Sequence, residues 1–455
     1  MTKLLSVTLT LGLTAGCSTS GLHSFPQAVP LPQSATPTVH RNSTAAGKIK
    51  HVVILMQENR SFENFFAGFP GANAPLFGYA IHNHKRVKVQ LHQTTFETNP
   101  DLPHIWQSAI GGWDQGKMDG FHTGPGDNYA AYAYIDHRQI APYWAMAQQY
   151  VLADAMFPSE FGGSYASHIM AVASNDELSA TEAIVNQPTH APNDCDAPPQ
   201  TRSSLVSNSR QIGRGNGPFP CFTQFNSIAN VLDAAGIPWR FYIKRQLNGG
   251  LYAPFETISY VRYGPDWDKD IIAPETSVLT DIDSGELAPV TWVIPRRDDS
   301  DLPGTFSDKG PSWITAIVNE IGKSQFWDST AIVITWDEWG GWYDNASPPQ
   351  LDYRGLGIRV PCLIISPYAR KGPSGAGYVS HTQYEWGSML RFIEEVYDLP
   401  EIGPASQGYT DRRSASLSDS FDFTQQPRRF KPFKAKYPRS YFIHLPPSYE
   451  PVDDE

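Results

Sequence analysis

Residues 331–338 read Ala331-Ile332-Val333-Ile334-Thr335-Trp336-Asp337-Glu338, an apolar run that ends in two adjacent acidic residues. A run of this length, rich in β-branched residues, is typical of a strand buried on both faces, as in a parallel sheet covered by helices. Comparable runs occur at His51 to Met56, Val290 to Ile294, and Val360 to Ile365. Because helical patterns lie between these runs, the sequence predicts a layered α/β domain with a mainly parallel central sheet flanked by helices.

Two helices can be predicted in some detail. The first carries apolar residues at helical spacing, namely Ile314, Ile317, Val318 and Ile321. Gly322 is expected to end that helix. The second opens with Ser380-His381-Thr382-Gln383, which has the form of a capping box, and is expected to continue through Ile393.

The amino-terminal end predicts export. Lys3 is followed by an uncharged apolar run from Leu4 to Ala15, which is too short for a membrane span of about 20 residues. The run ends in Leu13-Thr14-Ala15-Gly16-Cys17, which resembles a bacterial lipoprotein processing site with Cys17 as the acylated residue. We expect a periplasmic or outer-surface lipoprotein tethered to a membrane through lipidated Cys17; the alternative is an ordinary secreted protein whose signal peptide is cut nearby.

The chain divides into four expected segments. Residues 1–17 form the signal peptide, and residues 18–47, rich in Ser, Thr, Pro and Ala, form a flexible linker. Residues 48–400 contain the predicted strands and helices and form the main folded domain. Residues 401–455 are expected to pack on that core as a carboxyl-terminal extension.

Composition and charge exclude one class of partner. The chain is 40% hydrophobic and 18% charged, which is ordinary for a globular protein. It has 35 Lys and Arg against 46 Asp and Glu, a formal net charge of −11. This excess of acid argues against nucleic acid as a partner, because phosphate backbones favour clustered Lys and Arg. Small phosphate esters remain compatible, since a bound metal can supply positive charge.

Cysteine usage agrees with export, where disulfides can form. Cys195 and Cys221 flank a polar stretch with little hydrophobic periodicity. A bridge between them would close that stretch and add roughly 3 kcal/mol by loop entropy; two free thiols are the alternative. Cys362 lies in an apolar run and is expected to be a small core residue.

Polar residues follow two of the predicted strands. Glu58 and Asn59 come directly after the earliest run, and Asp337 and Glu338 end the run quoted first. In open α/β sheets, ligands gather beyond the carboxyl ends of the strands. Adjacent carboxylates repel each other when partly desolvated, and a divalent cation held by these oxygen donors would relieve that cost. The alternatives are that Glu58 and Arg60 form surface pairs with Asn59 as a turn residue, and that Asp337 and Glu338 are solvated loop acids.

A candidate nucleophile lies in Phe161-Gly162-Gly163-Ser164-Tyr165-Ala166-Ser167-His168. The glycine pair precedes Ser164, where we expect a helix to begin. A serine at a helix start lies among backbone amides that favour anions, including a transferred phosphoryl group. A serine that merely caps the helix is the alternative.

Several motifs of the chain together resemble those of one known family. Glu58-Asn59-Arg60-Ser61-Phe62 resembles the E-N-R-S-F motif of the bacterial phosphoesterase family of phospholipase C and acid phosphatase type. The resemblance continues through His104, through Thr335 to Asp344, and through Ser380 to Tyr384, and it spans residues 50 to about 430. It implies an alkaline-phosphatase-like α/β core, with residues 48–400 as the catalytic domain.

The resemblance also implies a site. A divalent metal cation, whose identity the sequence leaves open, would be bound by Glu58, Asn59, Ser164, Asp337 and Glu338. Ser164 would in addition be the catalytic nucleophile, which forms a phosphoserine intermediate.

Three histidines are the candidates to protonate the leaving alkoxide. His104 and His381 match histidines near the site of the family, and His168 follows Ser164 by one helical turn. The plainer alternatives are a surface turn residue for His104, a backbone-bonding helix cap for His381 and a structural helix residue for His168.

The sequence departs from the family pattern near the substrate. Gly163 and Ala166-Ser167 replace the Pro and the Pro-Asn that commonly surround the nucleophile, with Ser167 and His168 as candidates to replace the Asn. Leu302 and Asn345 stand where His is frequent. Since these positions would contact the phosphate or the leaving group, the choice of substrate is open.

The function expected first is that of an exported, acid phosphatase-like phosphoesterase that acts on a phosphate monoester. A phospholipase C-type phosphodiesterase acting on phospholipid head groups is the second. A non-catalytic surface binding protein on a decayed phosphoesterase scaffold is the third, from a different class.

Overall fold

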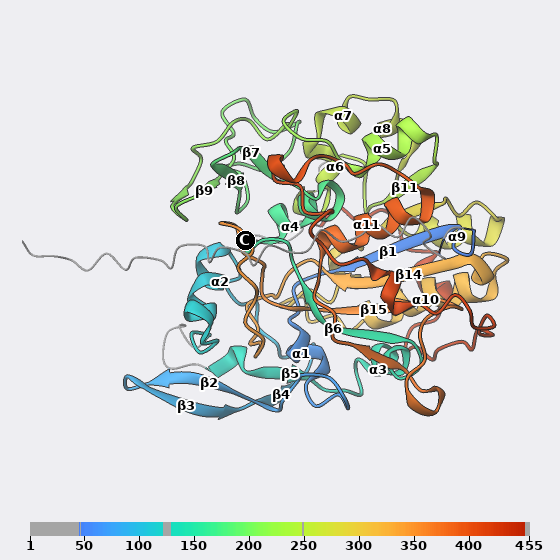
Figure 1. Ribbon diagram of the computed structural model, residues 1–455, viewed down its shortest axis with the longest axis horizontal. Helices are drawn as coiled ribbons and strands as arrows, with labels where there is room; N and C mark the ends of the chain where they lie inside the picture. Colours follow the sequence, from blue (N-terminus) through green and yellow to red (C-terminus); the bar gives the residue numbers. More distant parts are fainter. Residues whose placement is uncertain (1–44, 46, 122–128, 248–249, 451–455) are drawn as a thin grey trace, which may run out of the picture.

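A central sheet organises the molecule. The computed structural model describes residue 45 and residues 47–121, 129–247 and 250–450. Within these residues, nine strands form one sheet in the order β12-β11-β13-β1-β14-β15-β6-β16, and β17 pairs with β6 (Figure 1). Their bounds are β1 His51–Gln57, β6 Val151–Phe157, β11 Trp239–Tyr242, β12 Ile271–Ile272, β13 Val290–Val293, β14 Thr330–Trp336, β15 Val360–Ile365, β16 Tyr378–Ser380 and β17 Tyr384–Glu385.

The sheet is mainly parallel. β1 pairs in parallel with β13 and β14, and β16 and β17 pair in parallel with β6. β15 is antiparallel to both of its neighbours, β14 and β6, so it alone among the described strands of this sheet runs in reverse. The expected layered α/β fold with a mainly parallel sheet is confirmed, whereas the parallel direction expected for Val360 to Ile365 is wrong. A run buried on both faces has the same composition in either direction.

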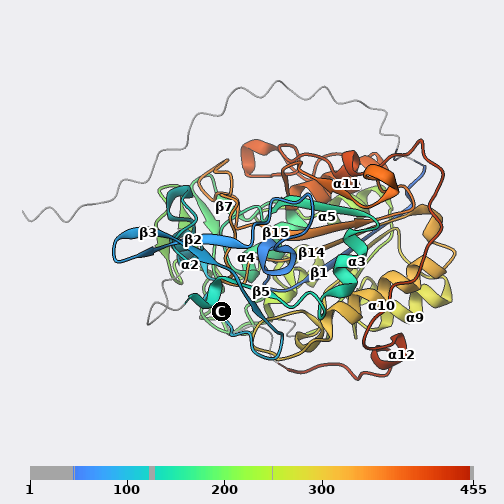
Figure 2. The ribbon, with the colours of Figure 1, turned by 90° about the horizontal axis from the view of Figure 1, so that it is seen from below.

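Helices cover both faces of the sheet. In Figure 2, α5 and α11 lie on one side of the strands and α3, α9 and α10 on the other. α4 contacts α5 and α11, and α10 contacts α3 and α9. The helices are α1 Phe62–Phe66, α2 Trp106–Trp113, α3 Ala141–Ala147, α4 Ser164–Ala173, α5 Ile228–Ala235, α6 Pro254–Thr257, α7 Ser259–Arg262, α8 Asp266–Lys269, α9 Ser277–Ser284, α10 Gly310–Lys323, α11 Trp386–Tyr397 and α12 Arg439–Phe442.

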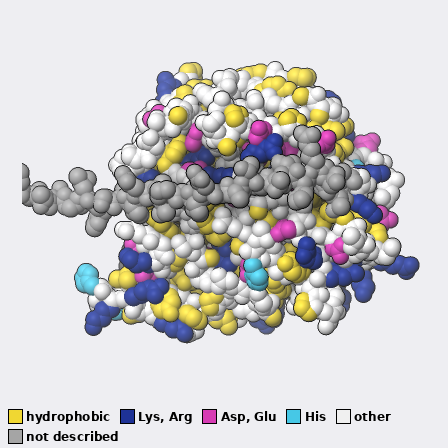
Figure 3. Space-filling model, in the orientation of Figure 1, with side chains coloured by type: hydrophobic (Ala, Val, Ile, Leu, Met, Phe, Trp, Pro, Cys, Tyr) yellow, Lys and Arg dark blue, Asp and Glu magenta, His cyan; other side chains and the backbone are white. Residues whose placement is uncertain are grey.

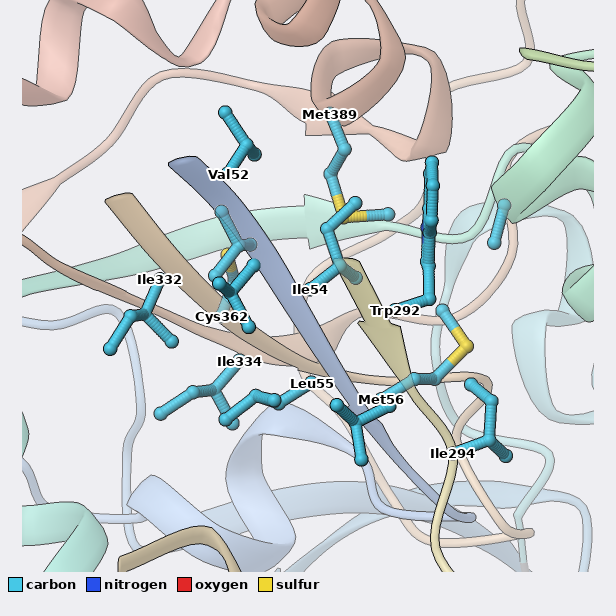
Figure 4. Close-up of a cluster of buried hydrophobic side chains, with 14 of the residues drawn as sticks. Val52, Ile54, Leu55, Met56, Trp292, Ile294, Ile332, Ile334, Cys362 and Met389 are labelled. Atoms are coloured by element: carbon cyan, nitrogen blue, oxygen red, sulfur yellow. The ribbon is translucent and has the colours of Figure 1, made fainter. Parts of the chain in front are cut away.

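This double cover explains the apolar runs. Every residue of β14 and β15 is buried, and side chains from β1 interleave with those of β13 and β14 (Figure 4). Cys362 lies in this core as a buried free thiol, as expected. β1 ends at Gln57 and β14 at Trp336, and polar residues that are themselves buried follow both strands.

The two predicted helices exist with different bounds. α10 buries the predicted apolar residues but continues past Gly322 to Lys323. Gly322 serves close packing instead, because a Cβ there would lie 2.4 Å from the ring of Phe430. The helix expected to open at Ser380 begins at Trp386, and the capping box is formed by Glu385 and Ser388.

Smaller sheets surround the core. β7 Glu177–Ser179, β8 Glu182–Ile184, β9 Leu205–Ser207 and β10 Ile212–Gly213 form a four-stranded sheet; β2 Phe77–His82 pairs with β3 Lys85–Gln90, and β4 His92–Thr94 with β5 Ala133–Ile135. The expected disulfide between Cys195 and Cys221 is present. It closes the chain segment that contains β9 and β10.

The carboxyl-terminal segment returns to the core. Phe421, Phe433 and Phe442 are buried within the main hydrophobic cluster. In the part of the chain that the structure describes, no helix combines the length and apolar character that crossing a membrane requires. The predicted signal peptide, Cys17 and nearly all of the predicted linker lie outside the described residues.

Candidate active site

The ends of two adjacent strands form one wall of the site. Gln57 of β1 is paired with Trp336 of β14, so the residues that follow leave the sheet at the same level. The backbone N–H of Asp337 donates to the carbonyl of Gln57 (2.9 Å), and the N–H of Asn59 donates to Asp337 Oδ1 (2.9 Å). The two polar segments therefore stay side by side beyond the strands, as the sequence predicted.

Glycine allows the second segment to approach the first. Gly340 has φ +63°, and a Cβ on it would lie 2.0 Å from the carbonyl oxygen of Asn59. Asn59 itself has φ +60°. A side chain at position 340 would therefore be strained by its own backbone angle and would push the Asn59 backbone away.

Helix α4 forms the opposite wall. It begins at Ser164, as expected, after Gly163 as N-cap. Ser167 Oγ donates to the carbonyl of Asp337 (2.5 Å) and accepts from Trp386 Nε1 (2.8 Å). Ser167 thus holds the helix start against the end of β14, and the role considered for it as a replacement for the family Asn does not agree with these contacts.

His168 extends from the same helix into a cluster of donors. Its Nε2 lies 3.2 Å from Glu58 Oε1 and 3.7 Å from Asp337 Oδ2. One donor atom from each of the three buried residues lies within 4.8 Å of the other two. Ser164 and His168 are separated by one helical turn, so they share the face of α4 that meets the strand ends.

The charge state of His168 decides what this cluster can hold. Burial lowers the pKa of His168 to about 4, although Asp337 acts in the opposite direction. The imidazole is therefore neutral near pH 7 and forms no ion pair with Glu58, despite the short distance. In its contact with Glu58 Oε2 (3.4 Å), Nε2 is the donor, because a carboxylate only accepts. The other neutral tautomer, with the proton on Nδ1, would offer the Nε2 lone pair to a cation held beside the two carboxylates.

The donor set fits a divalent cation. Asp337 Oδ2 accepts no hydrogen bond from any residue in the described part of the chain, and a buried carboxylate oxygen without a donor is costly. Two carboxylates and one neutral imidazole are ligands that transition-metal and zinc ions accept. His168 was predicted as a catalytic residue, and the structure adds it to the candidate ligands.

Asn59 is oriented by a histidine. Its Nδ2 lies 3.0 Å from His104 Nε2, and His104 Nδ1 lies 2.6 Å from the carbonyl of Leu102. The second contact places the imidazole proton on Nδ1, so Nε2 accepts from the Asn59 amide. His104 thereby fixes which amide atom of Asn59 faces away from it, namely the oxygen.

Two predicted site residues have other contacts. Glu338 Oε2 accepts from the N–H of Gly340 (2.9 Å). The backbone carbonyl of Glu338 accepts from the N–H of Arg60 (2.9 Å). His381 has a side chain that is 66% exposed, and its Nδ1 contacts Asp154 on β6 at 2.9 Å. Among the described residues, no contact joins His381 to the donor cluster.

A carboxyl that sequence reasoning did not single out lies behind the cluster. Asp301 Oδ2 accepts from Tyr143 Oη (2.7 Å) and Trp336 Nε1 (3.2 Å), and burial raises the pKa of Asp301 to about 7. Its loop contacts the site directly, because the N–H of Glu58 donates to the carbonyl of Ser300 (2.8 Å). The signal in the sequence that could have pointed to Asp301 was the next residue, Leu302, which stands where His is frequent in the family pattern.

The departures from the family pattern are built into the packing. Leu302 is buried. Asn345 Oδ1 accepts from Arg359 (2.9 Å), and Asn345 Nδ2 donates to Asn73 (2.8 Å). Neither side chain can act as the general acid that a histidine at that position could supply.

Two bacterial phospholipases C are similar to this chain in sequence. Non-hemolytic phospholipase C of Pseudomonas aeruginosa is 26% identical over 425 residues, which cover 80% of this chain and 56% of that protein, so this chain spans little more than half of that relative. Phospholipase C A of Mycobacterium tuberculosis is 23% identical over 450 residues, which cover 84% of this chain and 79% of that protein.

Among solved structures, a protein of the alkaline phosphatase superfamily from Vibrio parahaemolyticus is similar, with a TM-score of 0.35 and 11% identity over 77% of this chain and 67% of that one. A model of the phosphoesterase family matches residues 49–400, which contain both strand ends and the start of α4. The chain therefore belongs to the phosphoesterase family.

Proposed function

We propose that this protein is a metal-dependent phosphoesterase that hydrolyses phosphate esters through a phosphoserine intermediate on Ser164. The observation that carries the proposal is the buried cluster of Glu58, His168 and Asp337 beside the first turn of α4, which begins at Ser164. A surface binding protein has no need of buried metal ligands next to a helix-start serine. Catalysis explains the arrangement better.

The chain would hold its cation from both walls of the site. Glu58 and Asp337 would bind it from the strand ends and His168 from α4; the family resemblance adds Asn59, Glu338 and Ser164. When bound, a divalent cation supplies Lewis acidity that lowers the pKa of a coordinated hydroxyl and withdraws charge from a phosphoryl oxygen.

Ser164 performs the proposed chemistry. Its Oγ attacks phosphorus, the bond from phosphorus to the leaving alcohol breaks on the opposite side, and water then cleaves the phosphoserine. The first-turn amides of α4 are directed toward the phosphoryl oxygens, where they stabilise negative charge.

The histidines divide into different roles under this proposal. Both ring nitrogens of His104 are engaged, one with Asn59 and one with Leu102, so we assign His104 to positioning Asn59 rather than to proton transfer. His381 lies apart with Asp154, which argues against its role as leaving-group acid. A leaving alcohol of low pKa would need no proton from either histidine.

For the substrate, the relatives favour the diester. Both matched bacterial proteins named above are called phospholipase C, and this supports a phospholipase C-type phosphodiesterase that acts on phospholipid head groups. The acid phosphatase-like reading, with a phosphate monoester as substrate, remains the other candidate, because Leu302 and Asn345 change the groups near the leaving alcohol. Lys3, the apolar run to Ala15 and Cys17 support export, with a lipid tether as one form of it.

One experiment tests the reaction and separates the two substrates. A chain lacking residues 1–17 would be assayed on p-nitrophenyl phosphate and on p-nitrophenyl phosphorylcholine, before and after chelation and with divalent metal added back. We expect activity that chelation abolishes and metal restores, and preference for the second ester supports the phospholipase type. Ser164→Ala should abolish turnover while the remaining ligands still bind metal, though more weakly, and Ser406→Ala, which changes an exposed serine, is the control. Full activity of Ser164→Ala would refute the nucleophile.

A further inference from the structure

The hairpin formed by β2 and β3 is basic on an acidic protein. Between Glu63 and Glu97 the chain has no Asp or Glu, yet it carries Lys85, Arg86 and Lys88, although the whole chain has a formal charge of −11. In Figure 3, Lys, Arg and His side chains gather at the lower left corner, where Figure 1 places the hairpin. The exposed ones on the hairpin include His82, His84, Lys85, Arg86 and Lys88.

The hairpin has two different faces. Its register pairs Tyr79 with Lys88 and Ala80 with Val87, and successive residues of a strand point to opposite faces. Gly78 and Ala80 are buried against the body, with Val87 and Val89 partly buried there. The other face therefore points away from the body, and it consists of Phe77, Tyr79, Ile81, Arg86, Lys88 and Gln90.

The outward face combines aromatic rings with cations. Lys88 Nζ lies 3.6 Å from the ring centroid of Phe77, and the Arg86 guanidinium lies 3.8 Å from that of Tyr79. All of these side chains remain at least partly exposed. Aromatic rings bordered by long basic side chains suit the boundary between water and lipid, where the rings enter the head-group layer and the cations meet lipid phosphates.

The base of the hairpin is joined to the site. Gly78 packs against the ring of Tyr343, so closely that a Cβ would lie 2.4 Å from it, and Tyr132 Oη donates to the carbonyl of Tyr79 (2.6 Å). Tyr343 belongs to the same loop as Gly340, which contacts Asn59. A surface that docks on the hairpin would therefore be held at a fixed position relative to the donor cluster.

We propose that the outward face of the β2–β3 hairpin docks on an anionic membrane surface. Arg86 is partly neutralised by Asp119, at 3.0 Å. Most of the attraction therefore comes from Lys88 on the outward face and from Lys85, which pairs with His82 on the other face but is exposed beside the turn, at the tip of the hairpin. Each basic residue near an anionic bilayer contributes a roughly fivefold gain in binding. The inference deepens the proposed function, since it supplies a phospholipid surface to that site, but docking can be measured without turnover.

Vesicle binding tests the proposal. The full chain would carry Ser164→Ala, to keep the vesicles intact, and Cys17→Ser, to exclude a lipid anchor. Sedimentation would compare vesicles of phosphatidylcholine with vesicles containing equal amounts of phosphatidylcholine and phosphatidylglycerol. We expect binding only to the mixed vesicles, weakened by added salt. Lys85→Gln with Lys88→Gln should lower the partition coefficient at least tenfold, which two charges near the surface imply.

The control removes the same charge elsewhere. Lys371→Gln with Lys434→Gln changes two exposed lysines outside the hairpin and should leave vesicle binding nearly unchanged. Equal loss in both double variants, or no preference for anionic vesicles, would overturn the proposal. Vesicle binding by the Ser164→Ala chain together with an inactive parent protein would sustain docking while refuting the proposed function.

Discussion

His168 Nε2 lies 3.2 Å from Glu58 Oε1, although the two residues are 110 positions apart in the chain. The contact joins the first turn of α4 to the end of β1, and Asp337 completes the cluster from β14. Because all three elements are anchored in the core, the donors hold their positions before any ligand arrives. Preorganisation of this kind is what a tight metal site requires.

The first prediction concerns His168. His168→Ala removes one candidate ligand and should lower the affinity for divalent metal at least tenfold, measured as metal retained after dialysis against a graded chelator. His381→Ala is the matched control, since that side chain is exposed and lies with Asp154, and it should retain metal like the parent protein. If both variants retain metal equally, His168 is not a ligand.

The second prediction concerns Gly340. In Gly340→Ala the new Cβ would lie 2.0 Å from the Asn59 carbonyl at φ +63°, so we expect both metal loss and a stability decrease of at least about 2 kcal/mol, more than the angle alone costs. Gly236→Ala is the control, because Gly236 has φ +67° with nothing within 4 Å. Chemical denaturation measures the stability of both variants, and dialysis against a chelator measures the metal that each retains. Similar losses in the two variants would show that the contact with Asn59 is unimportant.

The fold was predictable where whole strands are buried. The runs that became β1, β13, β14 and β15 were identified because helices cover both faces, which leaves a strand nearly continuous in apolar residues. The direction of β15 depends on how it pairs with β14 and β6, and the local sequence of the strand carries no signal for that pairing. The capping form at Ser380 misled for a related reason: Tyr384 and Glu385 pair with β6, and this tertiary contact keeps the segment extended.

The site was predictable in part. Glu58 and Asp337 follow strands that lie side by side, so position in the fold brings them together, as expected. The approach of His168 depends on how α4 packs on the strand ends, although its spacing of one helical turn from Ser164 was a usable signal. The pairing of His381 with Asp154, and the burial of Asp301, depend on loop paths that neither periodicity nor motif spacing determines.

The third prediction concerns the orientation of Asn59. His104→Ala removes the acceptor that faces Asn59 Nδ2, so the amide can rotate, and metal affinity should fall about 10- to 100-fold, as for other residues that orient ligands. His104→Gln offers an amide oxygen as acceptor and should recover part of this loss. Metal titration followed by calorimetry measures both. If the glutamine variant is no better than the alanine variant, the hydrogen bond is not what orients Asn59.

The fourth prediction concerns pH. Burial first, and Asp411 second, raise the pKa of Glu394 from 4.5 to about 9. The folded protein therefore holds this proton more tightly than the unfolded chain, and the stability it contributes is complete below pH 4.5 and is lost as pH rises through about 9. The slope should approach about 1.4 kcal/mol per pH unit. In Glu394→Gln the side chain is neutral at every pH, so the free energy of unfolding in urea should fall less steeply over this range. Glu286→Gln is the control, because the Glu286 side chain is 60% exposed, and it should follow the parent protein. Parallel curves for all three proteins would mean that Glu394 is ionised in the fold.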